Sequence, residues 1–334
     1  MTKKTVVVLE SNTSGNSVHI IKAAHKLGFE THYLTRDIKL WRNARSDPAT
    51  HANRVSVVNT IDPVSMLDHI IDDVIAGIIW PDEIRLLPAV MLGAAKGILT
   101  PSQIKAFHTI RFKDLVRQIC NRYSSEVPYA VVNSNHFGDG SPVGYPCVVK
   151  PVDESGSFGV RRCDNDIDYQ EACSFLAANN THISGYQKAQ RLIIEKYVDG
   201  EEFSAEMVWH IEQGWCLIGF TRKLKGREPF FVEVGHIFPH EFEPNIEEHI
   251  KSTLRTCLDA IGLEKSVAHV EFKITNGKVT IIEINPRLPG DLIVELVKLS
   301  RGIDLGRLTC LAHLGLPWTL PSERTKLKTY ASVA

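Results

Sequence analysis

The most constraining feature of the sequence is a pair of apolar runs near its end, each with the alternation of a β-strand. The first run is His269 to Lys273, and the second is Ile281 to Arg287. Asn276-Gly277 between them is typical of a tight hairpin turn. We therefore predict a late β-hairpin that presents its polar residues on one face.

The polar residues of this hairpin form a row. Residues i, i+2 and i+4 of a strand point to one face, so Glu283, Asn285 and Arg287 should lie together. The hairpin would bring Glu271 beside them. Two carboxylates, an amide oxygen and a guanidinium suit a hard divalent cation and a phosphoryl group in transfer.

Length and charge limit the remaining possibilities. A chain of 334 residues should form two or three subdomains. The net charge is −1, with 38 Lys and Arg against 39 Asp and Glu, which gives no support for a nucleic-acid or anionic-membrane surface. We therefore expect a small-molecule ligand, with no nucleic acid and no membrane as partner.

The cysteines and the hydropathy pattern indicate a cytoplasmic protein. The 7 cysteines are scattered without CxxC spacing, which argues against a disulfide framework or a zinc site. The apolar run after Thr5 stops at Glu10, too soon for a signal peptide. No stretch is long enough to span a bilayer.

The first hundred residues alternate strand-like and helical segments, which predicts a parallel, doubly wound sheet. The helix is expected at 18–27, and the strands at 6–9, 29–34, 55–58, 74–80 and 97–99. Residues 102–123 read as one helix. After it the pattern changes to hairpins with helices, so the fold class is α/β plus α+β. The predicted units are 1–100, 101–127, 128–190 and 191–334.

Within the second part, a strand is expected over 145–151, another beginning at Gly159, a helix over 167–178, a strand over 192–198, and an antiparallel pair over 203–210 and 215–221.

A lysine followed by a serine–glycine loop is the next candidate site. Lys150 ends a short buried strand, and Ser155 to Gly159 can expose backbone N–H groups to phosphate oxygens. The loop is neither a Walker A loop nor GxGxxG. Taken alone, such a loop is more often a plain hairpin loop than a phosphate-binding loop. The lysine at the end of the preceding strand is what favours phosphate binding here.

Two further segments have both a structural and a functional interpretation. Glu195 to Val198 is a plain strand or a hinge that binds adenine, and Glu202 is solvated or binds ribose. Glu233 and His236 lie three residues apart, and a lone histidine is usually structural. The neighbouring acid raises the odds of an active-site role for His236.

Taken in order, these elements resemble the ATP-grasp superfamily over nearly the whole chain. The matching elements are Lys113 in a helix, Val149-Lys150-Pro151, the serine–glycine loop, Glu195 to Val198, and Glu271 with Glu283-x-Asn285-x-Arg287. The first hundred residues look like the preATP-grasp domain. Residues 128–190 and 191–334 look like the small lid subdomain and the large subdomain, joined to it by a helical linker.

More narrowly, Thr221 to Pro239 and Ile284 to Leu288 look like the L-amino-acid ligase branch, which resembles the bacilysin-ligase type of dipeptide synthase. The resemblance implies ATP as cofactor, with Mg²⁺, or Mn²⁺ as an alternative. The nucleotide-binding residues that it implies are Lys113, Lys150, Ser155, Gly156, Ser157, Glu195, Lys196, Tyr197, Val198 and Glu202.

The resemblance also implies the reacting groups. Glu271, Glu283 and Asn285 would hold the metal ions, and Arg287 would face the transferred phosphoryl group. The residues it implies for the acceptor region are Glu233, His236, Gly290 and Asp291. Because Pro289-Gly290-Asp291 departs from the run that many relatives have, the substrates cannot be carried over.

The expected activity is the ATP-dependent joining of a small carboxylate to an amine through an acyl phosphate. A bicarbonate-activating carboxylase and a non-catalytic ATP-binding module are alternatives with the same fold. The segment that contains Glu233 and His236 favours the ligase. The sequence leaves the oligomeric state open, although homodimers are common among similar proteins.

Overall fold

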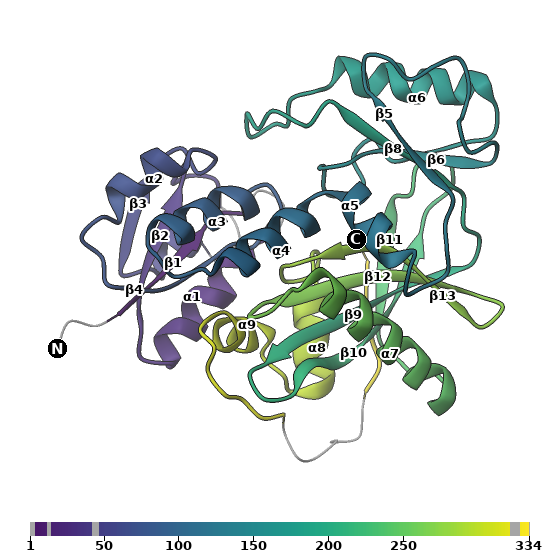
Figure 1. The fold of residues 1–334 in the computed structure, drawn as a ribbon. Coiled ribbons are helices and arrows are strands. Elements are labelled where there is room, and N and C mark those ends of the chain that lie inside the picture. The colour runs from purple at the N-terminus through teal and green to yellow at the C-terminus, as the bar shows by residue number, and fades with distance from the viewer. Residues whose placement is uncertain (1–3, 12–14, 42–46, 321–327, 334) are drawn as a thin grey trace.

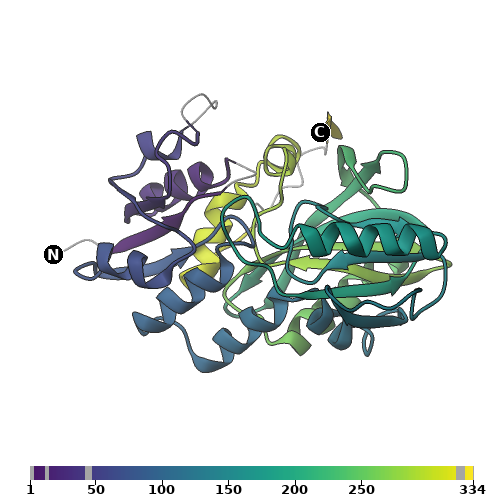
Figure 2. The same cartoon turned by 90° about the horizontal axis from the view of Figure 1, so that it is seen from above.

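Three β-sheets organise the chain in a computed structural model that describes all residues except 1–3, 12–14, 42–46, 321–327 and 334 (Figure 1). The N-terminal sheet lies to one side. A small antiparallel sheet lies above a larger one on the other side. Figure 2 shows the same arrangement from above. The predicted fold class, a parallel α/β unit followed by antiparallel sheets, is confirmed.

The N-terminal sheet is parallel and has the strand order β3-β2-β1-β4. Its central strand β1 is buried along its whole length, as its unbroken apolar run predicts. Its strands are β1 (Thr5–Leu9), β2 (Glu30–Thr35), β3 (Arg54–Val57) and β4 (Ile75–Ile79). Its helices are α1 (Ser17–Lys26), the short η1 (Pro48–Thr50), α2 (Pro63–His69) and α3 (Leu86–Ala95).

Two local predictions in this region are wrong. Residues 97–99 form a turn and no strand, because Gly97 has a φ of 67° and its N–H bonds back to Ala94 at the end of α3. The predicted helix over 102–123 is two helices, α4 (Pro101–Arg111) and α5 (Lys113–Cys120). Phe112 between them is extended, and the N–H of Lys113 bonds to Val152, 2.8 Å away.

The small sheet has the antiparallel order β5-β8-β6-β7 and is covered by helix α6 (Asp166–Ala178). Its strands are β5 (Tyr129–Asn133), β6 (Cys147–Pro151), β7 (Arg161–Cys163) and β8 (Arg191–Lys196). Strand β5 was not predicted, and β7 begins two residues later than expected. The serine–glycine loop connects β6 to β7, so both of its ends are fixed by one antiparallel ladder.

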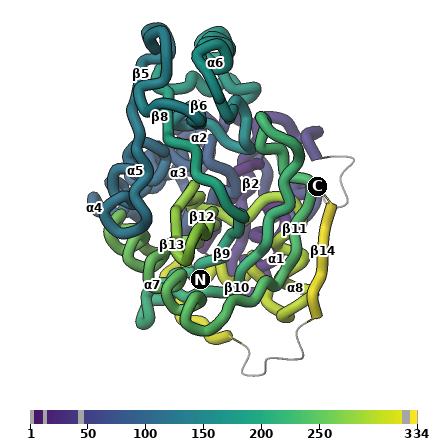
Figure 3. Tube along the Cα trace, turned by 90° about the vertical axis from the view of Figure 1, so that its right-hand side faces the viewer, coloured from purple at the N-terminus to yellow at the C-terminus, as the bar shows by residue number. Residues whose placement is uncertain are grey.

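The large sheet has the antiparallel order β13-β12-β9-β10-β11-β14, and Figure 3 shows β14 at its edge beside β11. Its strands are β9 (Glu201–His210), β10 (Gly214–Lys225), β11 (Glu233–His240), β12 (Val267–Thr275), β13 (Lys278–Asn285) and β14 (Tyr330–Val333). The helices of this part are α7 (Pro244–Ile261), α8 (Ile293–Arg301) and α9 (Leu305–His313).

The predicted late hairpin is confirmed. Strands β12 and β13 pair through the turn at Asn276 and Gly277, whose φ angles are 52° and 73°. The ladder contains a β-bulge that the sequence pattern did not predict. Glu271 pairs with Glu283 but Phe272 pairs with Ile281, so one residue of β13 is extra.

The N-terminal unit and the large sheet share apolar contacts. Helix α9 packs against α1, and one buried cluster includes Val7 of β1 and Phe272 of β12. These contacts fix the carboxyl end of β4 beside the end of β13. Among the described helices, none combines the length and the apolarity that a bilayer crossing needs.

Candidate active site

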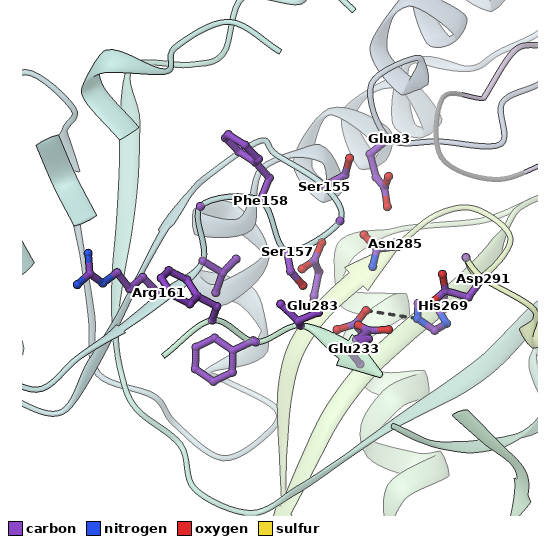
Figure 4. A pocket seen from close by; sticks show the side chains of 18 of the residues that line it. Glu83, Ser155, Ser157, Phe158, Arg161, Glu233, His269, Glu283, Asn285 and Asp291 are labelled. Carbon is purple, nitrogen blue, oxygen red and sulfur yellow. Dashed lines mark ion pairs between the residues drawn. The ribbon is translucent and has the colours of Figure 1, made fainter. Parts of the chain in front are cut away.

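A cavity of about 750 Å³ lies between the small and the large sheet. The serine–glycine loop and the β10–β11 connection form part of its wall, and strands β12 and β13 contribute its carboxylates. Glu83 reaches it from the N-terminal unit. Figure 4 shows Ser155 and Ser157 of the loop close to Glu283 and Asn285. All three sheets therefore contribute residues or connections to one site.

The structure brings the predicted row together at this cavity. Glu271 faces Glu283 across the hairpin, and Asn285 faces His269 in the same ladder. Arg287 follows β13 and also lines the cavity. The alternation of the strand places the polar residues on one face, as predicted, while Ile284 points into the core.

Glu271 is held by two buried cations. Lys223 Nζ lies 2.8 Å from its Oε2, and His269 Nε2 lies 3.3 Å from its Oε1. Burial would raise the pKa of Glu271, but Lys223 and His269 outweigh it and hold that pKa well below its usual range. Glu271 is therefore a permanent anion in the cavity wall.

Lys223 of β10 is the centre of a buried cluster of acids that the sequence analysis did not single out. Its Nζ is also 2.6 Å from Glu233 and 3.4 Å from Glu202. Burial would lower the pKa of Lys223, but the three carboxylates raise it well above its usual value. The lysine thus stays charged and ties together acids from β9, β11 and β12.

Arg287 is paired with Glu83, which was also missed. Glu83 Oε1 is 2.6 Å from Nε and 2.5 Å from Nη2 of Arg287. The amide nitrogen of Asn285, in the orientation that satisfies its neighbours, donates to Glu83 at 2.8 Å and to Glu283 at 2.9 Å. Glu83 lies just after β4, and the carboxyl ends of parallel strands are where ligands bind. The position just after a parallel strand was therefore the sequence feature from which a role for Glu83 could have been predicted.

The acceptor-region residues also meet. His236 Nε2 is 2.9 Å from Glu233 and 3.8 Å from Asp291. The His236 side chain is fully buried. Burial would raise the pKa of Glu233, but His236 and Lys223 lower it to about 2. Gly290 and Asp291 line the cavity, and Asp291 has a φ of 51°, a left-handed conformation that aspartate tolerates.

The predicted phosphate lysines do not line this cavity. Lys113 Nζ is 3.2 Å from Glu283. Lys150 Nζ is 2.7 Å from Glu195, which Arg117 contacts at 2.6 Å from the other side. Burial would raise the pKa of Glu195, but these two cations lower it to about 2. Each lysine therefore already has a carboxylate partner.

The hinge residues lie outside the cavity as well. Tyr197 donates to Glu228 at 2.6 Å, and the carbonyl of Val198 accepts from Lys273 at 2.8 Å. Lys196 donates to a backbone carbonyl, and Glu202 is buried beside Lys223. The structure thus groups Glu195 to Glu202 near the junction of the two antiparallel sheets, away from the cavity lining.

Comparison with known families identifies this architecture. Residues 143–295 match the model of the ATP-grasp domain. Residues 143–295 carry an ATP-grasp domain. The matched segment contains the serine–glycine loop, the hinge and the whole β12–β13 hairpin, so the predicted superfamily is confirmed.

Two curated relatives of this ATP-grasp chain illustrate its sequence likeness. It is 31% identical over 163 residues to the uncharacterized protein y4rH of Sinorhizobium fredii, an alignment that covers 49% of this chain and 32% of that protein. It is 28% identical over 222 residues to a D-alanine–D-alanine ligase of Wolbachia pipientis, covering 63% of this chain and 66% of the ligase. The chain thus spans less than two thirds of either relative.

Among solved structures, the ATP-grasp chain is similar to an L-amino acid ligase from Bacillus licheniformis. The TM-score is 0.77 at 19% sequence identity, and the superposition covers 99% of this chain and 80% of that one. A likeness at this identity establishes the fold.

The donor set of the ATP-grasp hairpin fits a hard divalent cation. Glu271 and Glu283 expose 16% and 22% of their side chains, both at the cavity. These carboxylates offer the oxygen ligands that Mg²⁺ prefers, and the Asn285 amide, whose nitrogen donates to Glu83 and Glu283, would have to turn over to add its oxygen. Glu271 also forms a second possible ligand group with Glu202 and Glu233, in which Lys223 already supplies the positive charge.

Proposed function

We propose that this protein is an ATP-dependent carboxylate–amine ligase that forms an amide bond through an acyl phosphate and uses Mg²⁺. The observation that carries the proposal is the convergence of Glu271, Glu283, Asn285 and Arg287 with the serine–glycine loop around one cavity. This cavity contains oxygen ligands and a guanidinium, as phosphoryl transfer requires.

The proposed reaction has two steps. A carboxylate oxygen of the first substrate attacks the γ-phosphorus of ATP, so ADP leaves and an acyl phosphate forms. The amine of the second substrate then attacks the acyl carbon, and inorganic phosphate leaves with the oxygen that the carboxylate supplied. Both steps depend mainly on alignment and charge stabilisation.

Different residues of the chain would bind the metal ion, the phosphates and the adenine. Glu271, Glu283 and Asn285 would hold Mg²⁺, which neutralises phosphate charge when bound. Lys113 and Lys150 would exchange their carboxylate partners for nucleotide phosphates, with Ser155, Gly156 and Ser157 closing over them. The hinge from Glu195 to Val198 would frame adenine, with Glu202 near ribose.

Arg287 would stabilise the phosphoryl group and the acyl oxygen. Its planar guanidinium can make paired hydrogen bonds that a lysine cannot reproduce. Burial would lower the pKa of Arg287, but Glu83 raises it, so the group stays charged. Glu83 also fixes the guanidinium from one side, and the Leu288 carbonyl accepts from Nη1 at 2.8 Å, so the remaining N–H of Nη1 and of Nη2 would face the substrate.

Asp291 would bind the amine as its ammonium ion before reaction. Within the described part of the chain, no lysine or arginine lies within ion-pair distance of Asp291, and its side chain is 45% exposed. His236, which contacts Glu233, would orient the incoming amine or polarise the acyl oxygen. The seven free cysteines suit a reducing cytoplasm.

The test is phosphate release by the purified chain with ATP and Mg²⁺, across a matrix of amino acids and small acids against amines, with mass spectrometry of the product. Phosphate release that needs both partners and yields an amide supports the proposal. ADP formation with bicarbonate and no amine would favour a carboxylase. ATP binding without turnover over the whole matrix would favour a non-catalytic module.

A further inference from the structure

The cavity has an apolar wall that the proposed chemistry does not use. We propose that this wall, formed by Phe230 and Val232 with Phe158 and Phe175, is a specificity pocket for an amino-acid substrate with a large apolar side chain. The inference rests on the proposed function, because it names the substrate class of the same site.

The wall consists of large apolar side chains that remain open to solvent. Phe230 and Val232 of the β10–β11 connection are 57% and 58% exposed, and Phe158 and Phe175 are 45% and 48% exposed. All four line the cavity. An apolar surface that is rimmed by polar groups is typical of a ligand site, since its burial by a ligand is favourable.

Neighbouring side chains contact the wall residues Phe158 and Phe230. Phe158 packs against Phe175 with ring centroids 5.9 Å apart, and Lys188 Nζ lies 4.5 Å from the Phe158 ring. The guanidinium of Arg161 lies 6.0 Å from the Phe230 ring. The wall is therefore an arranged surface from two connections and one helix.

A backbone hydrogen bond joins the two ends of the β10–β11 connection. The N–H of Gly226 donates to the carbonyl of Val232 at 2.8 Å, where the chain returns toward β11. Phe231, which also lines the cavity, stacks on Tyr197 with ring centroids 6.3 Å apart. These contacts anchor the connection that contains Phe230 and Val232, both of which line the cavity.

The polarity of the cavity sets the class of ligand. Asp291 lines the same cavity and, within the described part of the chain, has no lysine or arginine at ion-pair distance, so an amino acid's ammonium finds a partner there. Its side chain would then contact the apolar wall. A volume of about 750 Å³ lies within the range of small-molecule sites.

The size of the expected preference follows from apolar burial. One methylene in a hydrophobic pocket is worth roughly 10- to 200-fold in kcat/KM. Leucine, methionine or phenylalanine should thus exceed glycine or alanine by at least about 10-fold as a substrate. Phe230→Ala and Val232→Ala should each remove most of that ratio by lowering kcat/KM with the large apolar amino acids.

The experiment measures kcat/KM for phosphate release with each of these five amino acids, for the wild type, the two wall variants and Tyr123→Ala. Tyr123 is a matched control, because it is 46% exposed and lies outside the cavity lining. A wild-type preference for the large apolar amino acids that both wall variants reduce and Tyr123→Ala preserves supports the pocket.

Two results would overturn the inference, and they can be told apart. Amine-dependent phosphate release without an apolar preference, or with a preference that the wall variants preserve, rejects the pocket and leaves the ligase proposal standing. No amine-dependent phosphate release with any amino acid or small acid rejects the ligase proposal itself, and the pocket with it.

Discussion

Glu83 and Arg287 are 204 residues apart in the sequence, yet one carboxylate oxygen of Glu83 lies 2.6 Å from Nε and 2.5 Å from Nη2 of Arg287. Glu83 lies just after the parallel strand β4, and Arg287 follows the β12–β13 hairpin. This pair joins the N-terminal unit to the cavity, so the proposed active site depends on both.

Arg287→Lys should fail nearly as badly as Arg287→Ala in turnover. Lysine keeps the charge but loses the planar pair of donors, and removing one transition-state donor costs about 3 kcal/mol, or roughly a hundredfold in rate. The measurement is kcat for phosphate release. A lysine variant within a few-fold of the wild type would show that the guanidinium does not have the proposed role.

Glu271→Gln and Glu283→Gln should each raise the Mg²⁺ concentration needed for turnover and lower kcat by about a hundredfold or more, because each removes a charged oxygen ligand. Mg²⁺ titrations of ADP release measure both effects. Glu264→Gln, an exposed change outside the cavity lining, is the control. Normal ADP release at ordinary Mg²⁺ in either variant would reject the metal assignment.

Lys223→Met should destabilise the fold by about 3–5 kcal/mol at pH 7, because three buried or half-buried carboxylates lose their shared cation. The free energy of unfolding from urea titrations measures this loss. The loss should shrink at pH 5, where the acids that have lost Lys223 can take up protons. A variant as stable as the wild type at pH 7 would contradict the central place of Lys223 in this cluster.

His269 should make the protein less stable as the pH rises from about 6.5 to 9. Burial would lower the pKa of His269, but Glu206 and Glu271 raise it to about 9, above its unfolded value of about 6.5. The folded state therefore binds the extra proton, and its stabilisation is complete below pH 6.5 and lost through pH 9.

The loss should be at most about 3 kcal/mol, since each unit of pKa shift corresponds to about 1.4 kcal/mol. Urea titrations of the wild type and His269→Gln at pH 6.5 and pH 9 measure it. The variant should show a smaller difference between the two pH values. An equal difference in both proteins would mean that His269 is not the titrating group.

Most of the fold could be predicted from local sequence patterns. The apolar run of β1, the alternation in β12 and β13, and the Asn276-Gly277 turn each have a short-range cause, and each was predicted. The errors lie where tertiary contacts decide. Phe112 interrupts a helical pattern because the N–H of Lys113 bonds to Val152, which follows strand β6. The bulge in β13 depends on how β13 pairs with β12, and strand propensity along the sequence does not determine that pairing.

The site was predicted where it lies on one hairpin and missed where it needs partners from elsewhere. The sequence around Glu83 and around Lys223 contains no recognisable motif. The packing of the three sheets brings Glu83 to Arg287 and Lys223 to Glu271. An acid just after a parallel strand is a usable signal for Glu83. A buried lysine in β10 has no comparable signal, because its acids come from three other strands.

The most direct test of the account follows oxygen from substrate to phosphate. The acid substrate is labelled with oxygen-18 in both carboxylate oxygens, and the products are analysed by mass spectrometry. An acyl phosphate predicts one labelled oxygen in the released phosphate, one in the amide, and ADP as the nucleotide product. Phosphate without label, or release of AMP, would contradict the mechanism.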